Sequence, residues 1–417
     1  MSYNKFDNLN WLNNLVTKQL SFRKWTLNLI ASENIMSPDV SHYYTLPLGY
    51  RYGNYEGLDV KTRKYRGSHY IAEMEAHAIS NACNMFHAKV ADFRPLSGHI
   101  AGCAIVLGLC SPNDLVLELD KAAGGHCLAE KLSNSNIIKL RVKPIPFDDI
   151  SYQVNIDATI DKISKQKPRI VILGSSSYLF PTPLKEIAAA CRAYGSVLLL
   201  DASHVLGMIA GGIFPQPFDS DVDFIISSTH KTFAGPQGGM ILSRSSEIFQ
   251  NVLPALYPGL ISNHHLMRIP ALIALFAEWN EHGANYAKSI KKNAIKLAEE
   301  LEKIGIPVVN TPQGPTKSHT LLIKNRSINK GAKELSLHLE KCGIMVCAVK
   351  LPELHGGEGL RIGVQEITRF GLKTSQVPEL AIIIKDAIFS TKPEVIRSRV
   401  KDYTQYFQTV HYCNSHE

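Results

Sequence analysis

The strongest chemical candidate in the sequence is a lysine that lies among small polar residues. Lys231 belongs to the run Ser-Thr-His-Lys-Thr-Phe-Ala-Gly-Pro-Gln-Gly-Gly (residues 228–239), which directly follows an apolar segment typical of a buried strand. At the end of such a strand a side chain can reach into the crevice at the edge of a sheet. A lysine amine held there can form a Schiff base with an aldehyde. Most lysines are simply solvated, so the surrounding motifs must show whether Lys231 has a chemical role.

Several other short motifs supply that context. Pyridoxal phosphate is the cofactor that binds such a lysine, and Asp201, at the end of the run SVLLLD, can keep a pyridine nitrogen protonated so that the ring accepts electrons. Asp201 is alternatively a helix cap or turn residue. Ser97 and Gly98 open an expected helix, whose N-terminal N–H groups can bind phosphate, although Ser-Gly is often an ordinary turn. His126, after two glycines, can lie over a flat ring or be a plain loop histidine.

A sheet has to position these residues, and the sequence predicts one. From about residue 155 short apolar strands alternate with helices, which indicates a sheet buried on both faces. The expected strands are Arg169–Gly174, Ser196–Ala202, Asp223–Ser228 and one beginning at Met240–Ser243. The expected helices are residues 72–90, the stretch after Ser97, Ile156–Gln166 and Leu184–Tyr194.

The pattern changes after a long helix expected over Ala284–Ile304. Strands are predicted at Ser318–Lys324, Ile344–Val349 and Leu360–Val364, and helices at Lys333–Cys342 and Pro378–Ser390. We therefore expect three parts: a helical arm (1–30), a large cofactor-binding α/β domain (31–285) and a small C-terminal α+β domain (286–417).

Composition excludes several other classes of protein. The 417 residues are 45% hydrophobic and 20% charged, with a net charge of +8, which is the balance of a soluble globular chain. The charge excess is too small to establish a nucleic-acid partner, and we expect none. No apolar stretch is long enough to span a membrane, no secretory leader is apparent and the eight cysteines form no CxxC pair, so we expect a cytoplasmic protein without a metal site.

The motifs together resemble the serine hydroxymethyltransferase family. The segments that carry the resemblance are LIASEN (29–34), DASHVLG (201–207), THKT-x-x-GPQGG (229–239) and LRIG-x-x-x-x-TR (360–369), so it covers nearly the whole chain. The Gln in GPQGG and the run SNHHL (262–266) are most similar to the archaeal-type branch. The resemblance implies a fold-type I pyridoxal-phosphate transferase, with a large, doubly wound, mostly parallel seven-stranded sheet.

The resemblance also implies roles for residues at matching positions. Lys231 would hold pyridoxal phosphate as a Schiff base, with Asp201 on the pyridine nitrogen, His126 on the ring, His204 on the phenolic oxygen and His230 ordering the site. Ser97 and Gly98 would hold the phosphate, and Ser177 would also contact the cofactor. Arg361 and Ser32 would bind the substrate carboxylate, and Tyr65 would lie near the substrate. Tyr52 would reach the phosphate of a neighbouring subunit, and Gly238 would close the phosphate site from the partner chain. A homodimer, or a tetramer, is therefore expected.

Two features depart from the family pattern. The segment between Tyr52 and Gly67 is longer than usual, so either Glu56 keeps the role of catalytic carboxylate or Asn54 takes its place and the role is lost; we favour Glu56 because the Glu-Gly pair is kept. An amide expected near the final loop is replaced by Val349, which can neither donate nor accept a hydrogen bond. The use of tetrahydrofolate or another pterin therefore stays open.

The expected activity makes or breaks the Cα–Cβ bond of a β-hydroxy-α-amino acid, converting serine or threonine to glycine and a one-carbon unit or aldehyde. The first alternative is a pterin-independent L-threonine aldolase or transaldolase that transfers a glycyl unit to another aldehyde. An alternative of a different class is a pyridoxal-phosphate protein that interacts with RNA and lacks aldol activity, which only the positive charge supports.

Overall fold

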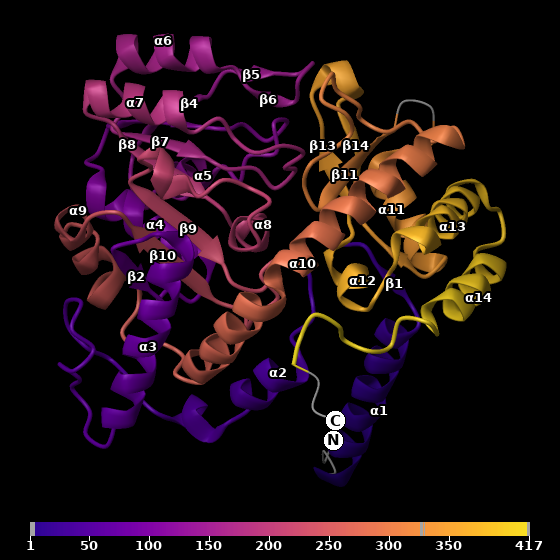
Figure 1. The fold of residues 1–417 in the computed structure, drawn as a ribbon, viewed down its shortest axis with the longest axis horizontal. Helices are drawn as coiled ribbons and strands as arrows, with labels where there is room; N and C mark the ends of the chain where they lie inside the picture. The colour runs from indigo at the N-terminus through magenta and orange to yellow at the C-terminus, as the bar shows by residue number, and fades with distance from the viewer. Residues whose placement is uncertain (1–4, 326–327, 329, 415–417) are drawn as a thin grey trace.

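Seven strands form the central sheet of the larger part of the molecule (Figure 1). The computed structural model describes residues 5–325, 328 and 330–414. In order across the sheet the strands are β2 (Val90–Asp92), β10 (Gly239–Ser243), β9 (Phe224–Ser228), β8 (Val197–Asp201), β7 (Ile170–Leu173), β3 (Leu115–Glu118) and β4 (Arg141–Pro144). Only β10 runs antiparallel to its neighbours. The predicted seven-stranded, mostly parallel sheet is confirmed.

Alternate residues of the middle strands enter two separate hydrophobic cores, one on each face of the sheet. In β7, Val171 and Leu173 join one core and Ile170 and Ile172 join the other. Side chains alternate along a strand, so a strand that is apolar at every position has both faces covered. This is why the strand sequences here read as continuous apolar runs.

Helices cover both faces. The first core takes side chains from α3 (His69–Phe86), α7 (Lys185–Tyr194), α8 (Leu206–Ala210) and α10 (Arg268–Lys303), and the second from α4 (Gly98–Leu109), α5 (Leu128–Asn134) and α9 (Ser246–Gln250). Helix α6 (Ile156–Gln166) lies beside α7, and α2 (Pro38–Tyr44) lies beside α10. A short hairpin joins β5 (Phe147–Asp148) to β6 (Gln153–Val154).

The C-terminal part is built on a second, smaller sheet, which is orange in Figure 1. Its antiparallel order is β11 (Thr320–Lys324), β14 (Glu358–Gly363) and β13 (Cys347–Lys350). The helices of this part are α11 (Ala332–Lys341), α12 (Gln365–Arg369), α13 (Val377–Phe389) and α14 (Pro393–Thr404). The mixed α+β character of this part agrees with its sequence pattern.

Three predicted elements differ in extent. The helix expected at 72–90 begins at His69 and ends at Phe86, because His87 takes a left-handed conformation (φ 56°) and the chain enters β2. The strand expected over 344–349 is two strands, since Ile344–Met345 (β12) pairs with Leu27–Asn28 (β1) while Cys347–Lys350 pairs with β14.

The long helix expected from Ala284 begins earlier, at Arg268. Pro270 does not prevent this, because a proline near the start of a helix interrupts no backbone hydrogen bond. Helix α10 therefore passes without a break through residue 285, the expected division between the large and small domains. That division stays a prediction.

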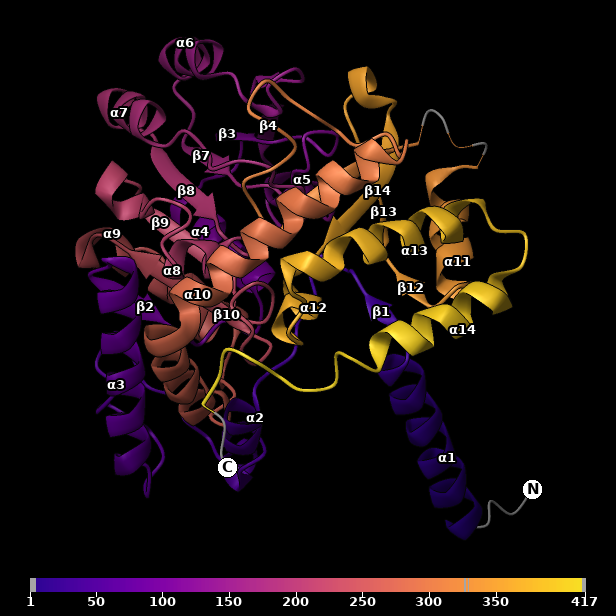
Figure 2. The same ribbon diagram turned by 45° about the vertical axis from the view of Figure 1, so that its right-hand side comes forward.

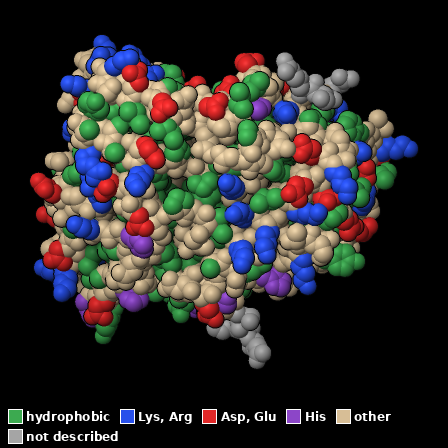
Figure 3. All heavy atoms as spheres, turned by 45° about the horizontal axis from the view of Figure 1, so that its top comes forward, with side chains coloured by type: hydrophobic (Ala, Val, Ile, Leu, Met, Phe, Trp, Pro, Cys, Tyr) green, Lys and Arg blue, Asp and Glu red, His purple; other side chains and the backbone are tan. Residues whose placement is uncertain are grey.

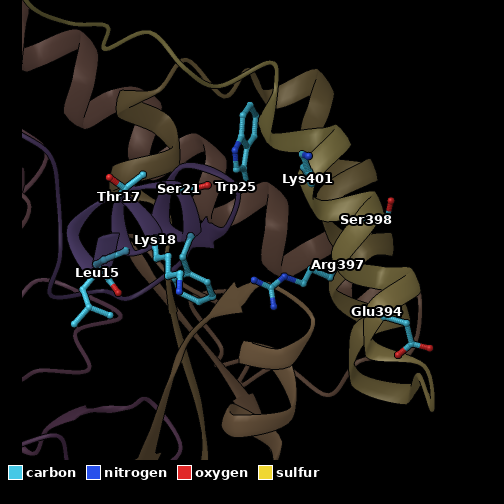
Figure 4. A pocket seen from close by; sticks show the side chains of 11 residues that line it. Leu15, Thr17, Lys18, Ser21, Trp25, Glu394, Arg397, Ser398 and Lys401 are labelled. Carbon is cyan, nitrogen blue, oxygen red and sulfur yellow. The ribbon is translucent and has the colours of Figure 1, made fainter. Parts of the chain in front are cut away.

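The N-terminal helix α1 (Lys5–Lys24) projects from the body of the molecule (Figure 2). Its large apolar side chains are exposed: Leu9, Trp11, Leu12, Leu15, Val16 and Leu20. Between its end and α14 lies a groove of ≈ 870 Å³ that is lined by Trp25 and Lys401, among others (Figure 4). The ammonium groups of Lys24 and Lys401 lie 5.0 and 5.4 Å from the centroid of the Trp25 ring. A helix is thus found where the helical arm is expected, and these six apolar side chains are exposed, whereas Phe22 near its end is half-buried beside Arg397 of α14.

Charged side chains of both signs are interspersed on the face drawn in Figure 3. Within the described residues no helix combines the length and the apolar character that crossing a bilayer requires.

Candidate active site

The carboxyl ends of the parallel strands bring the candidate residues to one edge of the large sheet. Asp201 is the last residue of β8, and the segment with His230 and Lys231 follows the end of β9. Ser177 follows β7, and His126 follows β3 in the same way. Parallel strands end at a common edge, so residues from four separate segments converge there. This is the crevice that the lysine motif predicts.

Lys231 lies in a largely buried position in this crevice. Burial lowers the pKa of its ammonium group, and the charge of Arg361 adds to the effect while Asp201 opposes it. A lysine with a lowered pKa has more neutral amine, which is the nucleophilic form. Its backbone carbonyl accepts a hydrogen bond from Nδ2 of Asn34 (2.8 Å), which also donates to the hydroxyl of Tyr286 (2.9 Å). Asn34 thus ties the LIASEN segment to the lysine loop.

Two histidines are stacked beside this lysine. The rings of His204 and His319 lie 5.8 Å apart at 26°. Burial lowers the pKa of His204 well below its ordinary value and that of His319 to about 3, and the charges of Lys231 and Arg361 add to both effects. Both imidazoles are therefore neutral near pH 7. Sequence reasoning missed His319, because it stands in an unremarkable Ser-His-Thr run that only the fold brings to the site.

His230 and His126 occupy different environments. His230 is partly buried, and burial with the charge of Lys231 lowers its pKa to about 4. His126 lies at the mouth of the crevice, where its Nε2 is 3.2 Å from Nδ1 of His99 and both ring nitrogens are 3.4 Å from Nζ of Lys131. Partial burial lowers the pKa of His126; Asp201 opposes that effect and Lys131 adds to it. The rings of His230 and His126 can therefore contact a ligand in their neutral form.

Arg361 is buried on β14 and faces the crevice from the small sheet. One of its terminal nitrogens donates to the carbonyl oxygen of Ser176, and its Nε has no hydrogen-bond partner among the described residues. The adjoining segment that carries Ser32 is held in place, because the N–H of Gly363 donates to the carbonyl oxygen of Leu29 (2.8 Å). The structure thus brings Leu29 and Ala31, which precede Ser32 in the LIASEN segment, against the end of the strand that carries Arg361.

The start of α4 forms a small polar cradle. Ser97 caps the helix, since its Oγ accepts from the N–H of Ile100 (3.1 Å). A Cβ atom added to Gly98 would lie 2.7 Å from Oγ of Ser228 and 2.9 Å from Oγ of Ser203, so only glycine leaves this space open. Helix N–H groups and three serines suit a phosphate group. Ser203 and Ser228 were not singled out in the sequence, because isolated serines carry no signal.

The residues that face this space fit pyridoxal phosphate. Buried polar atoms without a partner in the described chain include Oγ of Ser177, Nδ1 of His204 and Nδ1 of His230. Buried polar groups normally have partners, so these unsatisfied atoms mark a place for a polar ligand. Lys231 could bind the aldehyde of the cofactor, Asp201 could face its pyridine nitrogen, and the start of α4 could bind its phosphate.

The segment around residues 52–66 lies apart from this group. Tyr52 and Tyr65 are exposed, with ring centroids 4.9 Å apart, and Glu56 is exposed on the same segment. No hydrogen bond, ion pair or ring contact joins these three side chains to Lys231, within the residues that the structure describes. Asn54, in contrast, is buried, and its amide donates to the carbonyl oxygen of Ser262.

Gly238 packs within its own chain. Its φ is 155°, and a Cβ atom there would lie 1.8 Å from Cζ of Arg268, so no side chain fits. Arg268 is buried and donates to the carbonyl oxygens of Phe93 (2.9 Å) and Gly239 (3.0 Å). These contacts explain the glycine without a second subunit, and its expected role toward a partner chain stays a prediction.

Comparisons with known proteins agree with this geometry. The family model for serine hydroxymethyltransferase matches residues 7–384. A serine hydroxymethyltransferase of Aeropyrum pernix is 36% identical over 93% of this chain and 89% of its own, and one of Methanobrevibacter smithii is 37% identical over 96% and 94%. The crystal structure of an L-threonine transaldolase from Pseudomonas fluorescens, in its internal aldimine state, superposes with a TM-score of 0.91 at 27% identity, covering 98% of this chain and 94% of the other. The chain therefore belongs to the serine hydroxymethyltransferase family of pyridoxal-phosphate enzymes.

Proposed function

We propose that this enzyme makes and breaks the Cα–Cβ bond of a β-hydroxy-α-amino acid, with glycine as the common product or substrate. The observation that carries the proposal is the half-buried Lys231, whose pKa burial lowers and which lies in the field of Asp201 and Arg361 at the strand edge. Serine and threonine are the substrates that the family and the transaldolase neighbour suggest.

Pyridoxal phosphate, when bound to Lys231, supplies a ring that accepts the electrons of a broken Cα bond. In this proposal Asp201 would keep the pyridine nitrogen protonated, Ser97 and Gly98 would hold the phosphate, and Ser177 would also contact the cofactor. His126 would lie on the ring, and His204 would contact the phenolic oxygen. The low pKa values of the histidines support these roles, because neutral imidazoles accept or donate single hydrogen bonds without adding charge.

Arg361 binds the substrate carboxylate, with Ser32 beside it. A guanidinium can grip a carboxylate through two parallel N–H bonds, which fixes the orientation of the amino acid. The unpartnered Nε of Arg361 supports this assignment, since that nitrogen is still free to donate. The orientation that Arg361 imposes on the amino acid would decide which bond at Cα is broken.

Glu56 takes the proton of the substrate hydroxyl as the Cα–Cβ bond breaks. The exposed position of this carboxylate and the buried, bonded amide of Asn54 support Glu56 as the catalytic group of the segment. General bases must come within hydrogen-bond reach of the proton that they remove. Glu56 does not reach Lys231 of its own chain, so we place it, with Tyr52 and Tyr65, in the site of a second subunit.

A homodimer with shared active sites follows from that placement. The exposed apolar side chains of α1 support it, because a row of large apolar residues on a projecting helix is typical of a surface that another chain covers. A cyclic dimer would bring the 52–66 segment of each subunit to the site of the other.

A second function, threonine aldolase or transaldolase activity, is favoured by one observation. Val349 lies on β13 at the cleft between the two sheets and packs beside an apolar cluster that includes Tyr152, Phe180 and Leu322. An apolar surface there offers no hydrogen bond to the edge of a pterin.

Product analysis separates the two functions. The purified enzyme is incubated with serine or with threonine, each with and without tetrahydrofolate, and glycine, formaldehyde equivalents and acetaldehyde are measured. A hydroxymethyltransferase gives glycine from serine only with the pterin. Release of acetaldehyde from threonine at the same rate with and without the pterin, together with no serine turnover, would establish the aldolase instead. If neither serine nor threonine gives glycine, both functions are rejected.

A further inference from the structure

A cleft beside the active site carries an unusual set of lysines. It encloses ≈ 730 Å³ between the loop 121–127 with α5 on one side and β13 with the start of α11 on the other. His126, Ser176 and Ser177 also line it, so its inner end reaches the site of the expected cofactor. We call it the lysine cleft, after four of its lining residues, Lys121, Lys131, Lys333 and Lys350.

None of the four lysines forms an ion pair with an acidic side chain among the residues that the structure describes. The lysine ion pairs within the described residues involve Lys165 and Lys296, which lie elsewhere. Two acidic side chains, Glu130 and Glu358, share the lining of the lysine cleft. Glu358 is already engaged, because its Oε1 accepts from the N–H of Ala332 (2.9 Å), so it neutralises the start of α11. The cleft therefore keeps an excess of positive charge at the entrance to the site.

The wall of the same cleft is apolar where β13 passes. Ala348 and Val349 line it, next to Lys350. A ligand that suits both surfaces has an apolar body with an anionic group at one end. We propose that the second substrate, the one that gains or loses the glycyl unit, is an aldehyde that carries a carboxylate or phosphate. This inference rests on the proposed function and adds its substrate class.

The reaction balances without any further reagent. Threonine cleavage gives glycine and acetaldehyde. The Cα of glycine then gives up a proton and bonds to the carbonyl carbon of the acceptor aldehyde, whose oxygen takes up a proton. No atom is lost and nothing is oxidised, so the lysine cleft needs only to bind and orient the anionic acceptor.

A pair of aldehydes of similar shape tests the proposal. With threonine as donor, 4-formylbenzoate and 4-methylbenzaldehyde are compared as acceptors in the wild-type enzyme and in the double variant Lys333→Ala, Lys350→Ala. We expect the wild type to favour the anionic aldehyde, and the double variant to lose on the order of tenfold in kcat/KM for it while the neutral aldehyde changes by less than about twofold, because only the charged end meets the lysines. Raised salt should weaken the preference in the wild type alone.

Lys341→Ala is the matched control, since Lys341 is exposed at the far end of the same helix α11 and does not line the cleft. It should leave both aldehydes unaffected. Equal use of the two aldehydes by the wild type, or equal losses for both in the double variant, would overturn the proposal.

A third arm distinguishes the other source of the same anionic chemistry, the glutamate tail of a reduced pterin. Serine turnover is measured with tetrahydrofolate that carries one or three glutamates. If the double variant lowers serine turnover only with the three-glutamate pterin and leaves the use of both aldehydes unchanged, the aldehyde proposal is overturned in favour of a pterin tail. Acetaldehyde release from threonine without acceptor reports the proposed function separately, so its loss would not be mistaken for failed anion binding.

Discussion

At the scale of single residues, Lys231 has the environment of a Schiff-base lysine. Burial lowers the pKa of its amine, the charge of Asp201 opposes that effect, and the hydrogen bond from Asn34 to its backbone holds the loop at the strand edge. A surface lysine would have none of these features. The residue was found from sequence because its motif is local, and the structure supplies the low-dielectric setting that the motif needs.

Lys231→Ala should remove the covalent attachment and with it catalysis. We expect the purified wild type to be yellow and to absorb above 400 nm, and the variant to lose turnover by at least about a thousandfold, because the group that exchanges with the amino substrate is gone. Absorption spectra with added pyridoxal phosphate and glycine release from threonine measure the two effects. A colourless wild type that cannot be reconstituted would contradict the cofactor assignment itself.

At the scale of elements, a buried charge cluster holds the segment that carries Glu56. Glu75 of α3 is fully buried and pairs with Arg63, while Nε2 of His264 lies 3.1 Å from its Oε1. Arg63 also donates to the carbonyl oxygen of Gly53. The cluster thus joins both ends of the exposed segment to a helix of the core.

A second buried arginine holds the middle of the same segment. Arg94 donates to the carbonyl oxygens of Tyr55 (3.2 Å) and Gly57 (3.0 Å), and Asp92 neutralises it. Glu56 lies between these two anchored residues, so its backbone is fixed on both sides.

Glu75→Gln should therefore lower activity through the position of Glu56. Removing the charge leaves Arg63 buried without its partner, at a cost of about 3 kcal/mol in stability. We expect kcat for threonine cleavage to fall about tenfold or more while the absorption of the bound cofactor stays unchanged.

Glu73→Gln is the control, because Glu73 is exposed two residues away on the same helix. It should leave both readouts unchanged. If Glu75→Gln lowers the melting temperature but not kcat, the cluster stabilises the fold without positioning the catalytic group.

A second prediction at this scale concerns the junction between the N-terminal arm and α12. Glu366 accepts a hydrogen bond from Nδ2 of Asn28 (2.6 Å), which also donates to Glu33 (2.9 Å), and Arg23 pairs with Glu33. Burial raises the pKa of Glu366 to about 7, Arg23 opposes the rise and Glu33 adds to it. The folded protein therefore keeps this carboxyl protonated at pH values where the unfolded chain ionises it.

This raised pKa makes stability depend on pH. Below pH 4.5 both states are protonated, and between pH 4.5 and 7 only the unfolded state loses the proton, so the free energy of unfolding falls as pH rises. Relative to Glu366→Gln, the free energy of unfolding of the wild type should fall by up to about 3 kcal/mol between pH 4.5 and 7. Urea unfolding of both proteins from pH 4.5 to 8 measures the difference. In the control Glu379→Gln, at an exposed position on α13, the free energy of unfolding should depend on pH as it does in the wild type. If the free energies of the wild type and Glu366→Gln differ by the same amount at every pH, the coupling to Glu366 is refuted.

At the scale of the whole molecule, the site looks incomplete in one chain. Tyr52, Glu56 and Tyr65 are exposed, and no hydrogen bond, ion pair or ring contact joins them to Lys231 among the described residues. Helix α1 projects from the body of the molecule (Figure 2), and six of its large apolar side chains are exposed. The second subunit that we propose would account for both observations. Each chain would then supply a lysine to one site and a carboxylate to the other.

Mixing two inactive variants tests the shared site. Lys231→Ala and Glu56→Gln are unfolded, mixed in equal amounts and refolded together. If Glu56 acts in the partner's site, half of the dimers are hybrids with one intact site, so about a quarter of the wild-type activity returns. If it acts in its own chain, every site lacks one group and no activity returns. The same variants refolded separately give the baseline.

The α/β class and the alternating strands and helices could be predicted from the sequence alone, as could most of the candidate residues that the fold brings to the edge of the large sheet. These features are local: an apolar run reports a strand buried on both faces, and the lysine, aspartate and glycine motifs stand directly at the strand ends. The same local character explains why the helix Ile156–Gln166 and the strands around Leu199 and Ile226 were placed correctly within one or two residues.

The other features could not be predicted, because they depend on contacts between segments far apart in the chain. His319 joins the site through its stacking on His204, 115 positions earlier, and the run 344–349 divides into two strands because β1, near the N-terminus, pairs with its first half. The burial of Asn54 beside Ser262 and the meeting of α5 with β13 around the lysine cleft are equally long-range. Side-chain burial and charge pairing are properties of packed neighbours, and no local pattern of residues specifies who those neighbours are.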